Sequence, residues 1–171
     1  MKTVLPALAL GVTALALAGC EKAQEKPVEQ PMEHEAAPAA ETGVDGLTVS
    51  KAHLMMPTVT GNPAGVFFDL SYTGTEDLTL ESAEVTQSKG TMIHDVVEKD
   101  GMKQMVPLGP LTLKGGESVS FAPGGKHIMA MKLDEAVAPG GKVDVKLAFA
   151  GGKVASFTAD VMPAGEMKME H

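Results

Sequence analysis

The chain has 171 residues, of which 44% are hydrophobic and 4% aromatic, and it carries a formal net charge of −8. This length and apolar content support one compact domain rather than two. Its basic residues are all lysine, so the chain has no arginine fork with which to bind phosphate. An acidic chain without a basic cluster is poorly suited to nucleic acid, and we exclude nucleic acid as a partner.

Residues 1–19 have the pattern of a secretory signal peptide. Lys2 supplies a positive start, and the apolar run VLPALALGVTALALAG follows it. Cys20, the single cysteine, comes directly after LAG and resembles the lipidated cysteine of bacterial lipoproteins. A lone exported cysteine has no disulfide partner, which favours lipidation over an incidental thiol. We therefore expect a periplasmic lipoprotein held on a membrane by its lipid anchor, and Glu21 after the cysteine favours the outer membrane.

The rest of the chain divides into three segments. Residues 20–46 are rich in charge and proline and contain no aromatic side chain, which predicts a disordered tether behind the anchor. Residues 47–162 alternate short apolar stretches with turn residues, which predicts an all-β sandwich or small Greek-key barrel. Residues 163–171 are polar and predict a flexible tail. The expected strands are 47–54, 65–73, 78–86, 91–99, 102–108, 118–122, 127–133, 142–150 and 154–161.

Methionine is unusually frequent, with twelve residues against one tyrosine and no tryptophan. Methionine often fills gaps in cores, so a single residue of this kind says little. Here, however, methionines recur beside histidines, and thioether with imidazole is a donor set that suits Cu(I). The groups are Met32 with His34; His53 with Met55 and Met56; Met92 with His94, Met102 and Met105; and His127 with Met129 and Met131.

An Asp-Gly pair at residues 100–101 allows a geometric test of one group. If these two residues form the loop of a β-hairpin, the numbers of paired residues add up to 201, and Met105 lies opposite Val96. Met105 then shares a face with His94 and is its diagonal neighbour, whereas Met102 points to the other face. The hairpin therefore predicts that Met105, and not Met102, is the partner of His94.

Four residues have a spacing that resembles a known family. The signature H-x10-M-x21-H-x-M of the periplasmic copper chaperones called PCuAC is matched by His94, Met105, His127 and Met129. The segment GGESVSFAPGGKHIMAMKL is similar to the sequence around the second histidine of that signature. The resemblance implies a cupredoxin-like Greek-key β-barrel or sandwich with these four residues as Cu(I) ligands. It also implies delivery of copper toward the CuA site of cytochrome c oxidase, with the CuA subunit or a Sco-type protein as the acceptor.

The chain departs from this family in its first strand, where KAHLMMP replaces a segment with aromatic and arginine residues, so the identity of the partner stays open. His53 in this segment is either a spare ligand or a surface residue, and we favour the surface role. The family pattern makes Met131 a hydrophobic neighbour of the site. Methionine- and histidine-rich tails in the family are proposed to assist with Cu(II). The corresponding auxiliary candidates here are Met162, Met167, Met169 and His171.

Several other functions can be compared with copper delivery. Blue-copper electron transfer requires a cysteine thiolate, which the domain lacks. The sequence offers no nucleophile with a recognisable base, no H-E-x-x-H motif and no phosphate-binding loop, so we expect no enzyme. A copper-sequestering or tolerance lipoprotein would use the same ligands, and a structural β-sandwich lipoprotein would use the methionines only as core. We expect a monomer whose copper affinity falls as the pH drops through the histidine range near 6.5.

Overall fold

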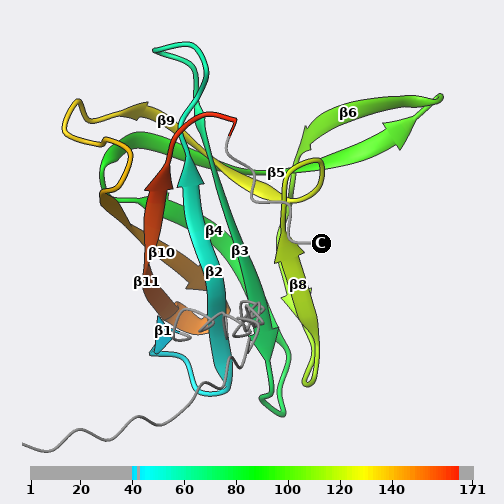
Figure 1. Ribbon diagram of the computed structural model, residues 1–171. Coiled ribbons are helices and arrows are strands. Elements are labelled where there is room, and N and C mark those ends of the chain that lie inside the picture. The colour runs from blue at the N-terminus through cyan, green and yellow to red at the C-terminus, as the bar shows by residue number, and fades with distance from the viewer. Residues whose placement is uncertain (1–39, 42, 166–171) are drawn as a thin grey trace, which may run out of the picture. The chain divides into compact units, whose positions relative to one another are not determined.

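The structure is a computed structural model, and it describes residues 40, 41 and 43–165 (Figure 1). The predicted signal peptide, Cys20 and the tail candidates Met167, Met169 and His171 lie outside these residues. In the part of the chain that the structure describes, no helix is long and apolar enough to cross a membrane. The elements are β1 (Ala40–Glu41), β2 (Leu47–Met55), β3 (Ala64–Tyr72), β4 (Leu78–Val85), β5 (Ser88–Lys99), β6 (Met102–Pro107), β7 (Leu111–Leu113), β8 (Ser118–Phe121), β9 (His127–Leu133), β10 (Lys142–Phe149), the 3₁₀ turn η1 (Ala150–Gly152) and β11 (Lys153–Met162).

Every strand expected from the sequence is present, and most of their ends agree within one residue. The largest difference is at β5, which begins at Ser88 rather than at residue 91. Two strands were not expected, β7 and β1, and both are too short to show a period. β1 lies inside the predicted tether and pairs with β2, and Val44 packs in the core. The folded part therefore extends several residues before Leu47.

The strands form one sheet with the order β6-β5-β9-β3-β2-β11-β10-β4-β7, to which β1 and β8 attach beside β2 and β3. All neighbours are antiparallel except β11 and β2, which are parallel. The last strand, β11, thus returns to lie beside β2, near the start of the fold, as in a Greek key. In the same sheet, β9 and β2 flank β3 on either side (Figure 1).

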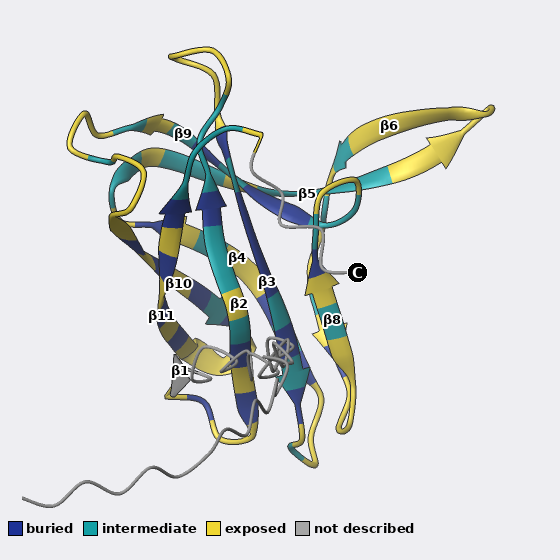
Figure 2. Ribbon diagram, viewed as in Figure 1, coloured by how far each residue is buried: buried dark blue, intermediate teal, exposed yellow. Residues whose placement is uncertain are grey.

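The core lies on one face of this sheet. Alternation of apolar and polar residues in β10 and β11 buries every second side chain, as expected for β-branched and aromatic residues on a half-buried strand (Figure 2). Phe68 stacks on Phe121 with ring centroids 4.4 Å apart and lies 5.2 Å from Phe157, which joins β3, β8 and β11. Leu54 of β2 and Ile128 of β9 are fully buried in the same core. Their neighbours along each strand therefore face outward.

The β5–β6 hairpin extends away from the rest of the sheet and is exposed near its tip (Figures 1 and 2). Its loop consists of Asp100 and Gly101, both with positive φ, 54° and 76°, as a type I′ turn requires. The ladder pairs Val96 with Met105 and His94 with Pro107. The predicted hairpin register is therefore confirmed.

Candidate metal centre

The outward face of β5 and β9 carries two histidines and two methionines in adjacent positions. His94 lies directly opposite His127, and Met92 lies directly opposite Met129. Directly opposed residues of an antiparallel pair point to the same side, as do residues two apart on one strand. Because Ile128 points into the core, these four side chains share the face away from it. The fold thus brings imidazoles and thioethers together from segments far apart in the chain.

The two imidazoles lie side by side, with ring centroids 5.9 Å apart and planes inclined by 43°. His127 is only 7% exposed, and its ring lies 6.2 Å from that of Phe67. Its Nδ1 donates a hydrogen bond to the carbonyl of Gly125 at 2.9 Å, which leaves the lone pair on Nε2. A bond of this kind fixes the tautomer and orientation of metal-ligating histidines.

His94 completes the pair with an unsatisfied nitrogen. Among the side chains that the structure describes, its Nδ1 is the one buried nitrogen or oxygen atom without a hydrogen-bond partner. Burial lowers the pKa of His94 below its ordinary value, and the neighbouring charge of His127 lowers the pKa further. A neutral imidazole is the form that binds a metal, so the surroundings of His94 favour the ligating state. A metal ion would also satisfy a buried nitrogen that has no partner.

An ion pair joins the two strands next to the imidazoles. Lys126, just before β9, lies 3.1 Å from the carboxylate of Asp95 on β5, and both side chains are partly buried. The other carboxylate oxygen accepts a hydrogen bond from the Val96 amide at 2.8 Å. The pair compensates its own charges and adds a side-chain link between β5 and the start of β9.

The thioethers differ in their exposure. Met129 follows His127 by two residues and is partly buried. Met105 of β6 lies opposite Val96 of β5 and is the diagonal neighbour of His94. The side chain of Met105 is 54% exposed. Met102 in the same hairpin is 62% exposed but belongs to the other face. The register therefore brings Met105, rather than Met102, to the edge of the imidazole pair.

Met131 lies on the same face as Met92 and Met129. Met131 lies opposite Gly90, and its methyl group is close enough that a Cβ at Gly90 would be 3.4 Å away. This contact agrees with the role of hydrophobic neighbour that the sequence resemblance gave to Met131. Met92, which the sequence grouped with His94 but which is not one of the four predicted ligands, is 51% exposed and lies beside the site, opposite Met129. Its position two residues before His94 was the available signal, because such residues share a strand face.

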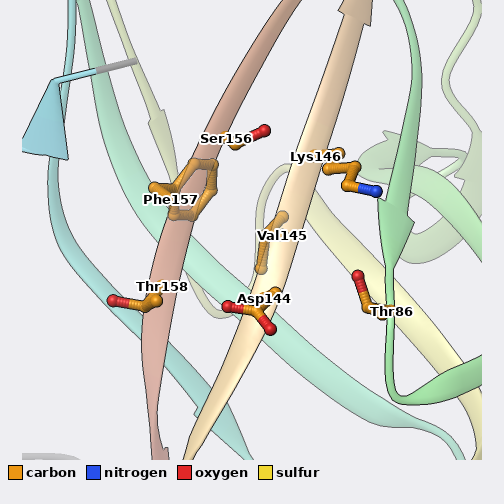
Figure 3. Close-up of a pocket in the computed structure, with 7 residues that line it drawn as sticks. All are labelled: Thr86, Asp144, Val145, Lys146, Ser156, Phe157 and Thr158. Atoms are coloured by element: carbon orange, nitrogen blue, oxygen red, sulfur yellow. The ribbon is translucent and has the colours of Figure 1, made fainter. Parts of the chain in front are cut away.

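In residues 40, 41 and 43–165 there is no group of three or more His, Cys, Asp or Glu side chains that could hold a metal. A surface depression over β10 and β11 has no imidazole or thioether in its lining (Figure 3). Its lining consists of Thr86, Asp144, Val145, Lys146, Ser156, Phe157 and Thr158.

Comparison with known proteins gives a family match over most of the β domain. The family model described as LpqE-like, a lipoprotein family, matches residues 47–161. A relative from Leifsonia xyli subsp. xyli (strain CTCB07), named "Putative lipoprotein Lxx21020", is 28% identical over 118 residues. That alignment covers 68% of this chain and 70% of the relative.

Two solved structures are similar in fold. The copper-bound PCuAC domain from PmoF2 gives a TM-score of 0.60 at 14% identity and covers 74% of this chain and 99% of that domain. The apo PCuAC domain from PmoF1 gives a TM-score of 0.59 at 17% identity, with coverage of 73% and 98%. At these identities the likeness concerns the fold. It confirms the all-β, cupredoxin-like architecture expected from the sequence.

Proposed function

This chain belongs to the LpqE-like family and has the fold of PCuAC domains, and from that premise we propose that its β domain binds one Cu(I) ion. The proposed ligands are His94, Met105, His127 and Met129. The observation that carries the proposal is the pair of facing imidazoles, in which one ring is held as the Nδ1–H tautomer and the other has a buried, unpartnered nitrogen.

The groups around the imidazole pair favour a soft metal ion. Along and across the strands, the neighbours of the two rings on this face are thioethers and apolar side chains, namely Met92, Met129, Val96, Pro107 and Phe67. Thioether sulfur selects Cu(I) over the hard cations that prefer oxygen ligands, and neutral imidazole suits copper as well. The copper-bound state of one structural relative is consistent with this choice.

We further propose that the protein is a metallochaperone and that copper is its cargo. A chaperone must release its metal, and Met105, 54% exposed on a projecting hairpin, is the ligand most open to replacement by a donor of a partner protein. The proposed acceptor is the CuA site of cytochrome c oxidase, reached directly or through a Sco-type protein. A lipid on Cys20 would hold the protein on a periplasmic membrane surface, consistent with the lipoprotein family.

A Cu(I) competition titration against a chromophoric chelator tests the binding site. The processed chain would carry Cys20→Ser, so that no thiol competes, and would be compared with His94→Ala and His127→Ala. We expect one tight equivalent that weakens by roughly 100-fold in each variant. Met102→Leu is the control, because Met102 lies on the other face of the β5–β6 hairpin and outside the four ligands. Equal, weak binding by all four proteins would contradict the proposal and favour a structural lipoprotein.

A transfer experiment distinguishes delivery from sequestration. The copper-loaded chain would be mixed with an apo CuA domain, and the copper content of each protein measured after separation. We expect copper to move to the CuA domain, because its cysteine thiolates are stronger ligands for copper than thioethers. Retention of copper by the chain would favour a tolerance protein that uses the same ligands.

A further inference from the structure

Strand β2 repeats the histidine and methionine pattern of β9. In residues 53–55 and in residues 127–129, a histidine and a methionine flank one apolar residue. The two apolar residues, Leu54 and Ile128, are both fully buried in the core. Because side chains alternate along a strand, both histidine–methionine pairs lie on the outward face of the sheet.

The two histidine–methionine pairs lie at the same level along β3, one on each side of it. Gly65 of β3 lies opposite Met55 on one side and opposite Met129 on the other. The Phe67 ring covers Gly65, since a Cβ at that glycine would lie 2.7 Å from Cζ of the ring. The centroid of the Phe67 ring is 5.4 Å from that of the His53 ring and 6.2 Å from that of the His127 ring. The Phe67 side chain therefore separates two similar histidine–methionine pairs.

The same kind of hydrogen bond orients the rings of His53 and His127. His53 Nδ1 donates to the carbonyl of Lys51 at 2.9 Å, just as His127 Nδ1 donates to Gly125. The carbonyl belongs in each case to the residue two positions earlier. In β2 a bulge interrupts the ladder there, with Lys51 at a φ of 55°. In the neutral ring of His53, Nε2 keeps its lone pair and is available to a metal.

A third soft donor comes from β11. Met162, the last residue of this strand, lies beside Met55 in the parallel ladder. Its neighbour Val161 is buried, so Met162 points to the same outward face as Met55. The amide of Met56 donates to the carbonyl of Met162 at 3.0 Å, which fixes the end of β11 against β2.

Next to His53, Met55 and Met162 lies a carboxylate that already has a partner. Asp160 lies beside His53 in the same ladder and is bonded to the ammonium group of Lys142. A hard carboxylate engaged with lysine is a poor ligand for a soft cation. The donors that remain are one imidazole and two thioethers.

We propose that His53, Met55 and Met162 form a second site for a soft monovalent cation, Cu(I) or its analogue Ag(I), across Phe67 from the first. It shares no ligand with the four-residue site and so does not depend on it. It binds more weakly than the first, because it has three soft donors in place of four. The sequence favoured a surface role for His53, which is here proposed as a ligand instead.

Silver titration followed by methyl NMR tests the second site. The processed chain with Cys20→Ser would be labelled with ¹³C-methyl methionine and titrated with Ag(I), which is diamagnetic and does not change its oxidation state. We expect the first equivalent to shift the Met129 methyl signal and the second to shift those of Met55 and Met162. The same two steps are expected when Met167→Leu, Met169→Leu and His171→Ala remove the donors of the tail.

Variants assign each step to its ligands. Met55→Leu and His53→Gln should each weaken the second step by roughly tenfold or more and leave the first unchanged. Met131→Leu is the matched control, because Met131 is partly buried on the same face but belongs to neither cluster, and it should retain both steps. His127→Ala should weaken the first step and keep the second, so failure of one site can be told from failure of the other.

Three results would overturn the proposal. One is a titration that saturates at one equivalent in every protein with an intact first site. Another is a second step that shifts only Met92, Met102 or tail methyl signals and leaves Met55 and Met162 unmoved. The third is a second step unchanged in both Met55→Leu and His53→Gln, with amide spectra showing that both variants are folded.

Discussion

His94 and His127 lie directly opposite each other on β5 and β9, with ring centroids 5.9 Å apart. The pairing continues along both strands, from Ser88 opposite Leu133 to the two histidines. A shift of one residue in this register would turn one imidazole into the core and leave the other outside. The imidazole pair is therefore a product of the folded sheet, and the unfolded chain has no equivalent site.

The two exposed methionines of the hairpin provide a first test. Met105→Leu should weaken Cu(I) binding by roughly tenfold or more, because it removes a thioether and keeps the volume of the side chain. Met102→Leu should leave the affinity unchanged, since Met102 points to the other face of the same hairpin. Both side chains are more than half exposed, so neither change should alter the free energy of unfolding appreciably.

Chelator competition and chemical denaturation of both variants provide the measurement. Equal copper affinities in Met105→Leu and Met102→Leu would show that the face of the hairpin does not matter. That outcome would remove Met105 from the ligand set.

The hairpin turn offers a second test. Gly101 has a φ of 76°, and alanine there should cost about 1 kcal/mol, because an L side chain is strained in the left-handed region. Gly116→Ala is the control, since Gly116 has a φ of 84° and open space around it in a turn before β8. We expect similar losses of stability in denaturant titrations but weaker copper binding only in Gly101→Ala, where the register of Met105 is disturbed. Equal copper affinities in the two variants would contradict a role for the hairpin.

The dependence on pH follows from the state of His94. Copper binds the neutral imidazole, so protons compete with it. Burial and the charge of His127 lower the pKa of His94 below 6.5, so this ring stays neutral to more acidic pH than usual. Chelator competition should give an affinity that is nearly constant above about pH 7 and falls at acidic pH. A constant affinity between about pH 8 and pH 5 would contradict histidine ligation.

The same shift has a consequence for the apo protein. The pKa of His94 is lower in the folded state than in the unfolded state, so protons bind the unfolded chain more readily. The contribution of His94 to the free energy of unfolding is therefore full above about pH 6.5 and declines as the pH falls toward the folded-state pKa. Denaturant titrations of the apo chain and of His94→Ala should show a smaller decline in the variant. A decline of equal size in both would contradict the lowered pKa.

A substitution in the core separates stability from copper binding. Ile128 lies between His127 and Met129 but points into the core, where it is fully buried. Ile128→Val should lower the free energy of unfolding by about 0.5–1.5 kcal/mol through the loss of one methylene group. Copper affinity should be unchanged in conditions where the variant is folded. A loss of affinity without a loss of stability would show that the two faces of β9 are not independent.

Local patterns explain why much of this fold could be predicted from the sequence. Alternation of apolar residues and glycine-rich turns located the longer strands, and the Asp-Gly loop predicted the register that pairs Met105 with Val96. β1 and β7 were missed because such short strands have no detectable period. The alignment of His53, Phe67 and His127 was also missed, since it depends on long-range pairing and on the bulge at Lys51. Such contacts leave no local signal in the sequence.

X-ray absorption at the copper edge would test the central proposal most directly. The processed chain with Cys20→Ser, loaded with one equivalent of Cu(I), should show a metal bound by imidazole nitrogen and thioether sulfur in equal number. Met129→Leu should lower the sulfur contribution, and Met131→Leu should leave it unchanged. A copper ion surrounded only by nitrogen and oxygen, or a sulfur signal that Met129→Leu does not alter, would contradict the four-residue site.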